Sequence, residues 1–148
     1  MIWITRERPK VGRVGCSWLI RRFIDPQAEF AFADGANLMA EAQRLSATIY
    51  HVDGSELSRQ GDSASFEVTA RRYHLVEGDP ALALLCQIVN TADIPRGPTQ
   101  RPEGPGLRAV IDGLLLIEAD DQQVLRQGWL VYDALYASCQ DLVRRGRA

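Results

Sequence analysis

The chain has 148 residues, of which 46% are hydrophobic and 24% are charged, values that are ordinary for a globular protein of one domain. Its formal net charge of −2 and pI near 5.7 make nucleic acid an improbable partner, because nucleic-acid-binding domains are usually basic overall. The first residues are charged and no long apolar run follows, so we expect neither a signal peptide nor a membrane span. These features predict a single domain over residues 1–148.

In the first third of the chain, three short segments alternate apolar and polar residues and are rich in strand formers. The expected strands are residues 2–5, 28–33 and 47–52. Helical spacing of apolar residues lies between them, at residues 14–24 and 38–45. Short helical crossovers of this kind favour parallel pairing, so the sequence predicts a β-α-β-α-β unit with a sheet of about three strands.

From residue 65 onward the apolar period becomes helical, which predicts an α+β domain that is mostly helical. The expected helices are residues 65–73, 79–92, 107–118 and 122–143, and the second starts with the capping pair Asp79-Pro80. Residues 95–106 contain four of the seven prolines and three glycines. This composition predicts a Pro/Gly-rich surface loop within the single domain.

The last expected helix carries an apolar stripe with steps of four and three residues, typical of a helix face that packs on a core. A seam between two copies of the chain, in a homodimer, is the alternative. The stripe consists of Leu125, Trp129, Tyr132, Tyr136, Cys139 and Val143.

Basic residues concentrate at the start of the chain. Residues 1–22 hold six basic residues and one acidic residue, whereas residues 23–148 hold eleven basic and eighteen acidic residues. This asymmetry suggests a small anionic ligand at the N-terminal part of the domain. The six cations are Arg6, Arg8, Lys10, Arg13, Arg21 and Arg22.

Cys16 lies near the expected start of the helix at residues 14–24, where the helix dipole favours a thiolate or a bound oxyanion. Its spacing to Arg22 matches the C-x5-R motif of tyrosine phosphatases, but the residues between suit a helix and not an anion-binding loop. A buried cysteine that acts as a small apolar residue is the alternative. The three cysteines contain no CxxC pair, which indicates reduced thiols and a cytoplasmic location.

Arg21 and Arg22 are adjacent on the expected helix and cannot both point fully into solvent. We expect one of them to pair with a carboxylate such as Glu56 or Asp62. His51 is close to several carboxylates in sequence, but no metal-binding histidine spacing is present, so a hydrogen-bonded histidine at the surface or at a rim is predicted.

Several motifs resemble the C-terminal domain of the chromate-resistance ChrB family, and the resemblance covers nearly the whole chain. The resemblance implies a part in chromate resistance. Longer family members carry an additional N-terminal region and act in the regulation of a chromate efflux transporter. The motifs are WITRERPK at residues 3–10, CSWLIRRFIDP at 16–26, ELS at 56–58, GD at 61–62, SFE at 65–67, DD at 120–121 and VYDALY at 131–136.

The chain departs from the family pattern at three positions that hold histidines in other members. Three imidazoles near carboxylates imply a transition-metal site in the family. An arginine cannot become a metal ligand, so we predict no metal cofactor at Glu56, Asp62 and Asp120 in this chain. The three replaced positions are Arg59, Gln60 and Gln122.

The preferred hypothesis is a cytoplasmic binding or sensor module that responds to an oxyanion or to its redox chemistry. The alternatives are a thiol- or metal-dependent oxidoreductase that acts on chromate or its by-products, and a structural partner protein. We expect chromate or sulfate to bind near the start of the helix around Val14. The residues available to hold the anion are Arg6, Arg8, Arg13, Arg21 and Arg22, beside Cys16.

Overall fold

The computed structural model describes residues 1–147, and its element order confirms an α+β domain with a small N-terminal sheet. The strands are β1 (Ile2–Arg6), β2 (Glu29–Ala33) and β3 (Thr48–Ile49). The helices are α1 (Val11–Leu19), α2 (Leu38–Leu45), α3 (Ser65–Arg72), α4 (Pro80–Asp93), α5 (Glu103–Ile117) and α6 (Asp121–Arg144). A π-helical turn, η1 (Ile20–Ile24), continues α1.

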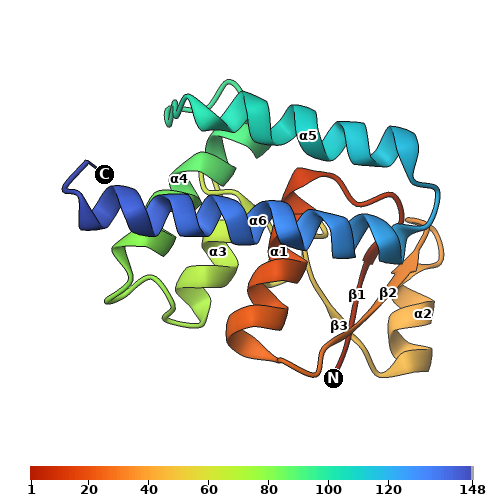
Figure 1. The fold of residues 1–148 in the computed structure, drawn as a ribbon. Helices are drawn as coiled ribbons and strands as arrows, with labels where there is room; N and C mark the ends of the chain where they lie inside the picture. The colour runs from red at the N-terminus through yellow and green to blue at the C-terminus, as the bar shows by residue number, and fades with distance from the viewer. Residues whose placement is uncertain (148) are drawn as a thin grey trace.

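The three strands are parallel and follow the order β2-β1-β3, so β1 is the central strand (Figure 1). Consecutive side chains of β1 point to opposite faces of the sheet. Trp3 packs into the main core, whereas Ile4 packs with Leu38 and Ala42 of α2 in a second, smaller cluster. The sheet is therefore covered by apolar side chains on both faces, as parallel sheets require.

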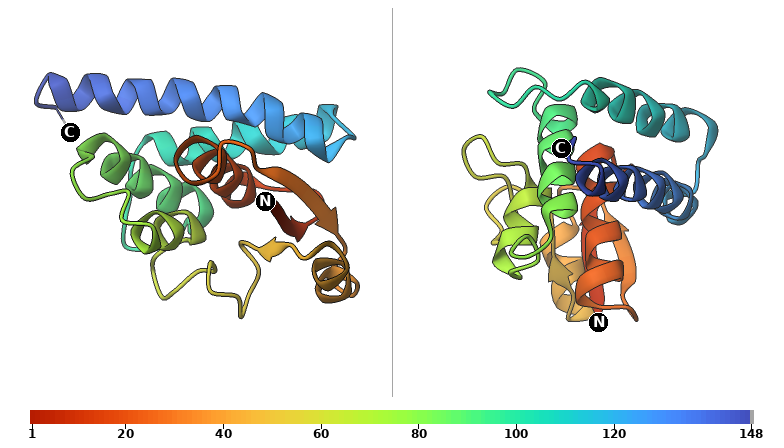
Figure 2. Two further views of the ribbon diagram at one scale, coloured as in Figure 1. Left: turned by 90° about the horizontal axis from the view of Figure 1, so that it is seen from below. Right: turned by 60° about the vertical axis from the view of Figure 1, so that its left-hand side comes forward.

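The long helix α6 runs across the molecule and packs against α1 and α4, while α5 packs mainly against α4 (Figures 1 and 2). The apolar stripe of α6 faces this core: Leu125, Tyr132, Tyr136 and Cys139 are buried. Trp129 and Val143, which complete the stripe, are partly buried and pack against the same core. The interpretation of the stripe as a core face is confirmed.

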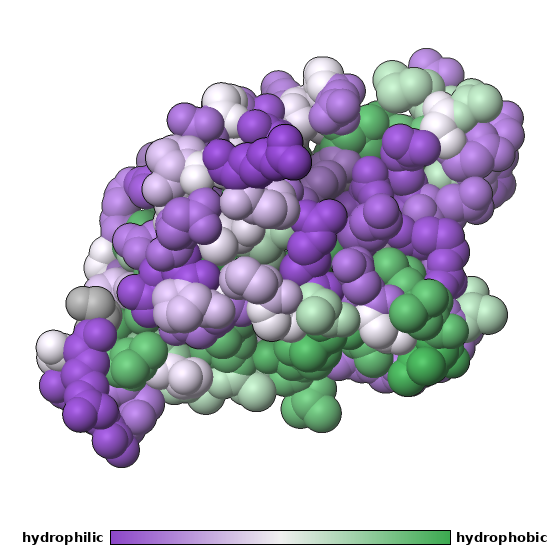
Figure 3. Space-filling model, turned by 90° about the horizontal axis from the view of Figure 1, so that it is seen from above, coloured by the Kyte–Doolittle hydropathy of each residue, from purple (hydrophilic) through white to green (hydrophobic). Residues whose placement is uncertain are grey.

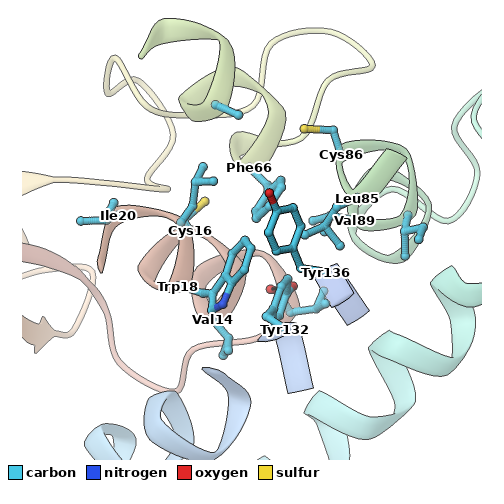
Figure 4. Close-up of a cluster of buried hydrophobic side chains, with 14 of the residues drawn as sticks. Val14, Cys16, Trp18, Ile20, Phe66, Leu85, Cys86, Val89, Tyr132 and Tyr136 are labelled. Atoms are coloured by element: carbon cyan, nitrogen blue, oxygen red, sulfur yellow. Dashed lines mark hydrogen bonds between the residues drawn. The ribbon is translucent and has the colours of Figure 1, made fainter. Parts of the chain in front are cut away.

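Aromatic rings from α1, α3 and α6 fill the centre of the main core (Figure 4). Trp18 of α1 lies 6.2 Å from Phe66 and 5.8 Å from Tyr132, measured between ring centroids. Tyr136 and Phe23 contact the same indole at centroid distances of 5.6 Å each. Rings at these separations contribute about 0.5–1.5 kcal/mol per pair beyond the burial of their area.

Three predicted boundaries are wrong. The first helix starts at Val11 and not at residue 14, although Lys10 provides no side-chain cap. The third strand is two residues long. The N–H of Tyr50 still donates to the carbonyl of Ile4 of β1, but His51 has a φ of 50° and its N–H donates to the carbonyl of Leu57 instead. The loop predicted at 95–106 ends earlier, since α5 begins at Glu103 and includes Pro105 in its first turn, where a proline is tolerated.

Within residues 1–147, no helix is both long and apolar enough to cross a membrane. Apolar surface is nevertheless visible along one edge of the molecule seen from above (Figure 3). The most exposed large apolar side chains among the described residues are Leu116 and Ile117 at the end of α5, which are 87% and 81% exposed. Leu130 of α6 is also exposed.

Helices α1 and α6 approach each other closely at Gly15. A β-carbon added to Gly15 would lie 2.6 Å from the hydroxyl oxygen and 2.8 Å from Cζ of Tyr132. The Tyr132 ring is fully buried, and its hydroxyl donates a 2.7 Å hydrogen bond to the carbonyl of Val11. The ring therefore cannot move aside without losing both packing and this bond.

We expect Gly15→Ala to lower the free energy of unfolding by about 1–3 kcal/mol, because the new methyl group overpacks the interface between α1 and α6. Gly113→Ala is the matched control, since Gly113 lies within α5 and a β-carbon there meets nothing within 4 Å. This control should raise stability by up to about 1 kcal/mol through helix propensity alone. Urea unfolding of both variants gives the comparison, and equal effects would contradict the close contact.

Arg8 connects the loop between β1 and α1 to the turn between α5 and α6 through hydrogen bonds. Its Nη2 donates to the carbonyls of Leu115 (2.6 Å) and Glu118 (2.8 Å), and its Nη1 donates to the carbonyl of Ala119 (2.9 Å). Asp121 completes the cluster by accepting from Nη1 at 2.9 Å and from the Arg8 backbone N–H at 2.8 Å. The guanidinium thus caps the carboxyl end of α5.

Arg8→Gln should lower the free energy of unfolding by about 1–3 kcal/mol, because several hydrogen bonds across the fold are lost at a half-exposed site. Arg44→Gln is the control, since Arg44 pairs with Glu41 of the same helix at the surface and with no other carboxylate in residues 1–147. The control should change stability by less than about 0.5 kcal/mol. Chemical denaturation at two salt concentrations distinguishes the two arginines, and similar small losses would show that the Arg8 cluster contributes little.

Candidate functional site

The carboxyl ends of β1 and β3, the start of α1 and the end of α4 surround an open pocket of about 460 Å³. Ligand sites of parallel α/β sheets lie outside the carboxyl ends of the strands, so this is the expected position for a site. We call it the β1–α1 pocket. Its lining residues are Arg6, Glu7, Arg8, Lys10, Gly12, Arg13, His51 and Asp93.

Three of the pocket's cations lack an acidic partner among the described residues. Arg6, Lys10 and Arg13 form no ion pair with a carboxylate in the part of the chain that the structure covers. The Nε of Arg13 is buried and has no hydrogen-bond partner among residues 1–147. Burial and the nearby charge of Arg6 lower the pKa of Arg13, which reflects an electropositive and poorly solvated position.

The amino end of α1 opens into the same pocket. Lys10 precedes the helix without a capping side chain, and no acidic residue lies in the first turn. Val14 is the first residue whose N–H reaches a helical carbonyl, that of Lys10 at 2.9 Å. The N–H groups before it have no acceptor within the helix, so the dipole and these donors favour an anion there.

His51 links the pocket to Cys16. Its Nε2 lies 3.9 Å from Oδ2 of Asp93, and its Nδ1 lies 3.8 Å from the Sγ of Cys16. His51 has a positive φ of 50°, an uncommon backbone conformation for a residue with a side chain. A β-carbon at Gly12 would lie 2.2 Å from the His51 ring and 2.5 Å from Asp93, so only glycine permits this arrangement.

Of the two alternatives for Cys16, the surroundings favour the buried cysteine over a thiolate at a helix start. Cys16 lies in the second turn of α1, is fully buried, and is too far along the helix to benefit from its amino end. Burial, with the charge of Asp93, raises the pKa of Cys16. Burial also lowers the pKa of His51 despite the opposing effect of Asp93, so the imidazole is neutral near pH 7.

Two buried hydroxyl groups lie beside the thiol. The Tyr50 side chain is fully buried, its hydroxyl has no hydrogen-bond partner in residues 1–147, and its pKa is raised by burial and by Cys16. The hydroxyl of Thr69 is close enough to lower the pKa of Cys16, but it forms no hydrogen bond of standard geometry with any described residue. Buried polar groups without partners are uncommon and mark this region as unusual.

Arg21 and Arg22, which the sequence grouped with Cys16, lie at the opposite end of the helix. Gly12 and Arg21 are separated by nine residues, which corresponds to about 13 Å of helix. Arg21 stacks over Trp129 at 4.6 Å, and Arg22 forms a 2.9 Å ion pair with Asp133. The structure therefore brings Arg6, Arg13 and Cys16 near one pocket and places Arg21 and Arg22 elsewhere.

Arg8 also lines the pocket, but its guanidinium is occupied by the contacts that hold α5 and α6. Glu56 lies in a separate surface pocket of about 380 Å³, where it forms a 2.9 Å ion pair with Arg72 and not with Arg21 or Arg22. Asp62 lines a third pocket, of about 520 Å³, that shares Asp93 with the β1–α1 pocket.

The positions of the family's histidines have different surroundings in this chain. Gln60 forms an isolated bridge with Ser63, while Gln122 donates a 2.6 Å hydrogen bond to the carbonyl of Phe30. Arg59 donates to the carbonyl of Gly61. No group of three His, Cys, Asp or Glu side chains suited to a metal ion occurs within residues 1–147. The absence of a metal cofactor stays a prediction.

Sequence reasoning did not identify Gly12, His51 and Asp93 as parts of one site. His51 was expected to be a hydrogen-bonded residue at the surface or at a rim, and the structure places it in the lining of the pocket. Its place near the carboxyl end of the strand predicted at residues 47–52 was the available signal, because the ends of parallel strands gather at one edge. Asp93 carried no signal beyond its place at the end of a helix.

Comparisons with known proteins agree with the resemblance seen in the sequence. The family described as the C-terminal domain of ChrB matches residues 3–139. Protein ChrB of Cupriavidus metallidurans is 36% identical over 134 residues, which cover 90% of this chain and 39% of that protein. The chain thus spans about two fifths of the relative's length, and no solved structure matches it. The chain belongs to the ChrB C-terminal domain family.

Proposed function

We propose that this domain binds a small tetrahedral oxyanion of the chromate and sulfate class in the β1–α1 pocket, as the binding or sensor module of a chromate response. The observation that carries the proposal is the buried Nε of Arg13, which has no partner in the described chain and belongs to a side chain that lines the pocket. A planar guanidinium with free donors suits paired hydrogen bonds to an oxyanion.

Charge and backbone geometry support the same ligand class. Arg6 and Lys10 add positive charge around Arg13, and the amino end of α1 adds unpaired N–H donors. Glu7 and Asp93 oppose the anion, so the pocket favours a ligand that contacts the arginine side. The family's association with chromate resistance makes chromate the oxyanion of interest, and sulfate its unreactive analogue.

The test is a titration of sulfate and chromate against the wild type, Arg13→Gln and Arg22→Gln, at constant ionic strength adjusted with chloride. Ligand binding to the folded state stabilises it by about 2.7 kcal/mol at a hundredfold excess over Kd, which a thermal shift detects. Loss of a charge-assisted contact worth about 1.5–3 kcal/mol should weaken binding in Arg13→Gln by tenfold or more.

Arg22→Gln is the matched control, because Arg22 lies in the same helical segment but far from the pocket and pairs with Asp133. Its own melting temperature is expected to fall, but the shift produced by sulfate should equal that of the wild type. Equal responses in all three proteins, or a loss in Arg22→Gln alone, would eliminate the β1–α1 pocket as the site.

A further inference from the structure

Charge and shape alone give the β1–α1 pocket no means of distinguishing chromate from sulfate. Both are tetrahedral oxyanions that carry up to two negative charges, and arginine and backbone donors hydrogen-bond to either one. The two ions differ in chemistry: hexavalent chromium exchanges an oxygen ligand for a thiol sulfur, whereas the sulfur of sulfate does not. A thiol next to the pocket would therefore provide the selectivity that its cations lack.

Cys16 is placed for that role. It follows Gly12 by four residues in α1, so the two lie on the same face of the helix, one turn apart. Gly12 lines the pocket and has no side chain to separate its interior from the next turn. His51 contacts the thiol with Nδ1 and lies next to Asp93 with Nε2, so its ring has the thiol on one side and the pocket on the other.

We propose that Cys16, with His51 as its proton acceptor, reacts with hydrogen chromate in the β1–α1 pocket to form a thiochromate ester, and that this step makes the site selective for chromate over sulfate. The inference rests on the proposed function, since the anion must first bind beside Arg13. It assigns chemical roles to Cys16 and His51 that simple electrostatic binding does not require.

The step balances without any electron donor. A chromium–sulfur bond forms as a chromium–oxygen bond breaks, and the thiol proton passes through His51 to the departing hydroxyl group, which leaves as water. Chromium stays hexavalent and the sulfur is attached to it as a thiolate ligand. The charge of the hydrogen chromate ion is kept by the product, next to Arg13.

The arrangement of Cys16, His51 and Asp93 resembles that of activated nucleophiles, in which a base contacts the nucleophile and a third group orients the base. A neutral imidazole is required to accept the proton, and burial keeps His51 neutral near pH 7. Cys16 is fully buried, so the anion reaches its thiol only if the His51 ring turns; this ring is 19% exposed and makes long contacts with Cys16 and Asp93. Tyr50 and Thr69 offer hydroxyl donors to oxygens that reach the thiol.

The other two cysteines lack this arrangement. Cys86 and Cys139 are buried as well, and burial raises the pKa of Cys86 to about 12 and that of Cys139 to about 11. Neither thiol contacts a histidine among the described residues, since His74 bonds Glu77 at the surface. Cys86 is therefore a matched control: a buried thiol of the same fold without a histidine contact among the described residues.

The experiment mixes the chain of residues 1–148 with chromate and follows two readouts. Visible absorbance detects the chromium–sulfur charge-transfer band, and native mass spectrometry detects the covalent adduct. The variants are Cys16→Ser, Cys16→Ala, Cys86→Ser and His51→Gln, and each is checked for folding by circular dichroism. Sulfate affinity is measured on every protein that folds. Two different substitutions are made at Cys16, so that the test can still be read if one of the two variants does not fold.

We expect the adduct in the wild type and in Cys86→Ser, and no adduct in either Cys16 variant. His51→Gln should form it at least about tenfold more slowly, because a general base is lost. Sulfate affinity should stay within about twofold in Cys86→Ser. In the folded Cys16 variants the adduct should be lost while sulfate still binds, and in His51→Gln the rate should fall even at saturating chromate, which separates chemistry from binding. Sulfate binding without any adduct, or an adduct that survives loss of Cys16, would overturn this inference and leave the proposed function standing. Absence of sulfate binding to the wild type would overturn both.

Discussion

The absence of β-carbons at two positions of α1 is the constraint on which the structure depends. Gly15 permits contact with the buried Tyr132 ring of α6, and Gly12 permits His51 and Asp93 to meet at the end of the sheet. Helix α1 thus packs against α6 on one side and lines the candidate site on another. Glycine lowers helix propensity by about 1 kcal/mol per residue, so the helix persists through its packing and not through its local sequence.

The basic residues at the start of the chain serve two different purposes. Arg8, Arg21 and Arg22 hold parts of the fold together through carbonyls, an aromatic ring and a carboxylate. Arg6 and Arg13, in contrast, have no carboxylate partner within residues 1–147 and line an open pocket. An arginine whose donors are satisfied thus holds parts of the fold together, whereas an arginine whose donors have no partner is a candidate ligand contact.

The sequence predicted the fold better than the site. Periods of two and of 3.6 residues were sufficient for the parallel sheet and the helices, because buried faces require them. The start of α1 was missed by three residues, since Lys10 is not a capping type, and this error alone moved Cys16 from the first turn to the second. His51 and Asp93 are 42 residues apart in sequence, so only the tertiary fold brings them together. Adjacency in sequence also grouped Arg21 and Arg22 with residues at the other end of the helix.

The π-helical turn at Ile20–Ile24 has a consequence for how related domains can vary in length. Its defining bond runs from the N–H of Asp25 to the carbonyl of Ile20, 2.7 Å, so this turn accommodates one residue more than an α-helical turn. Removal of a single residue here would leave an ordinary turn between the same neighbours. The same deletion a few residues earlier, within α1, would rotate the helix face that carries Gly12 and Gly15 by about 100° relative to the segment that follows. In an alignment of such domains, single-residue gaps should therefore gather in this turn and be absent from α1.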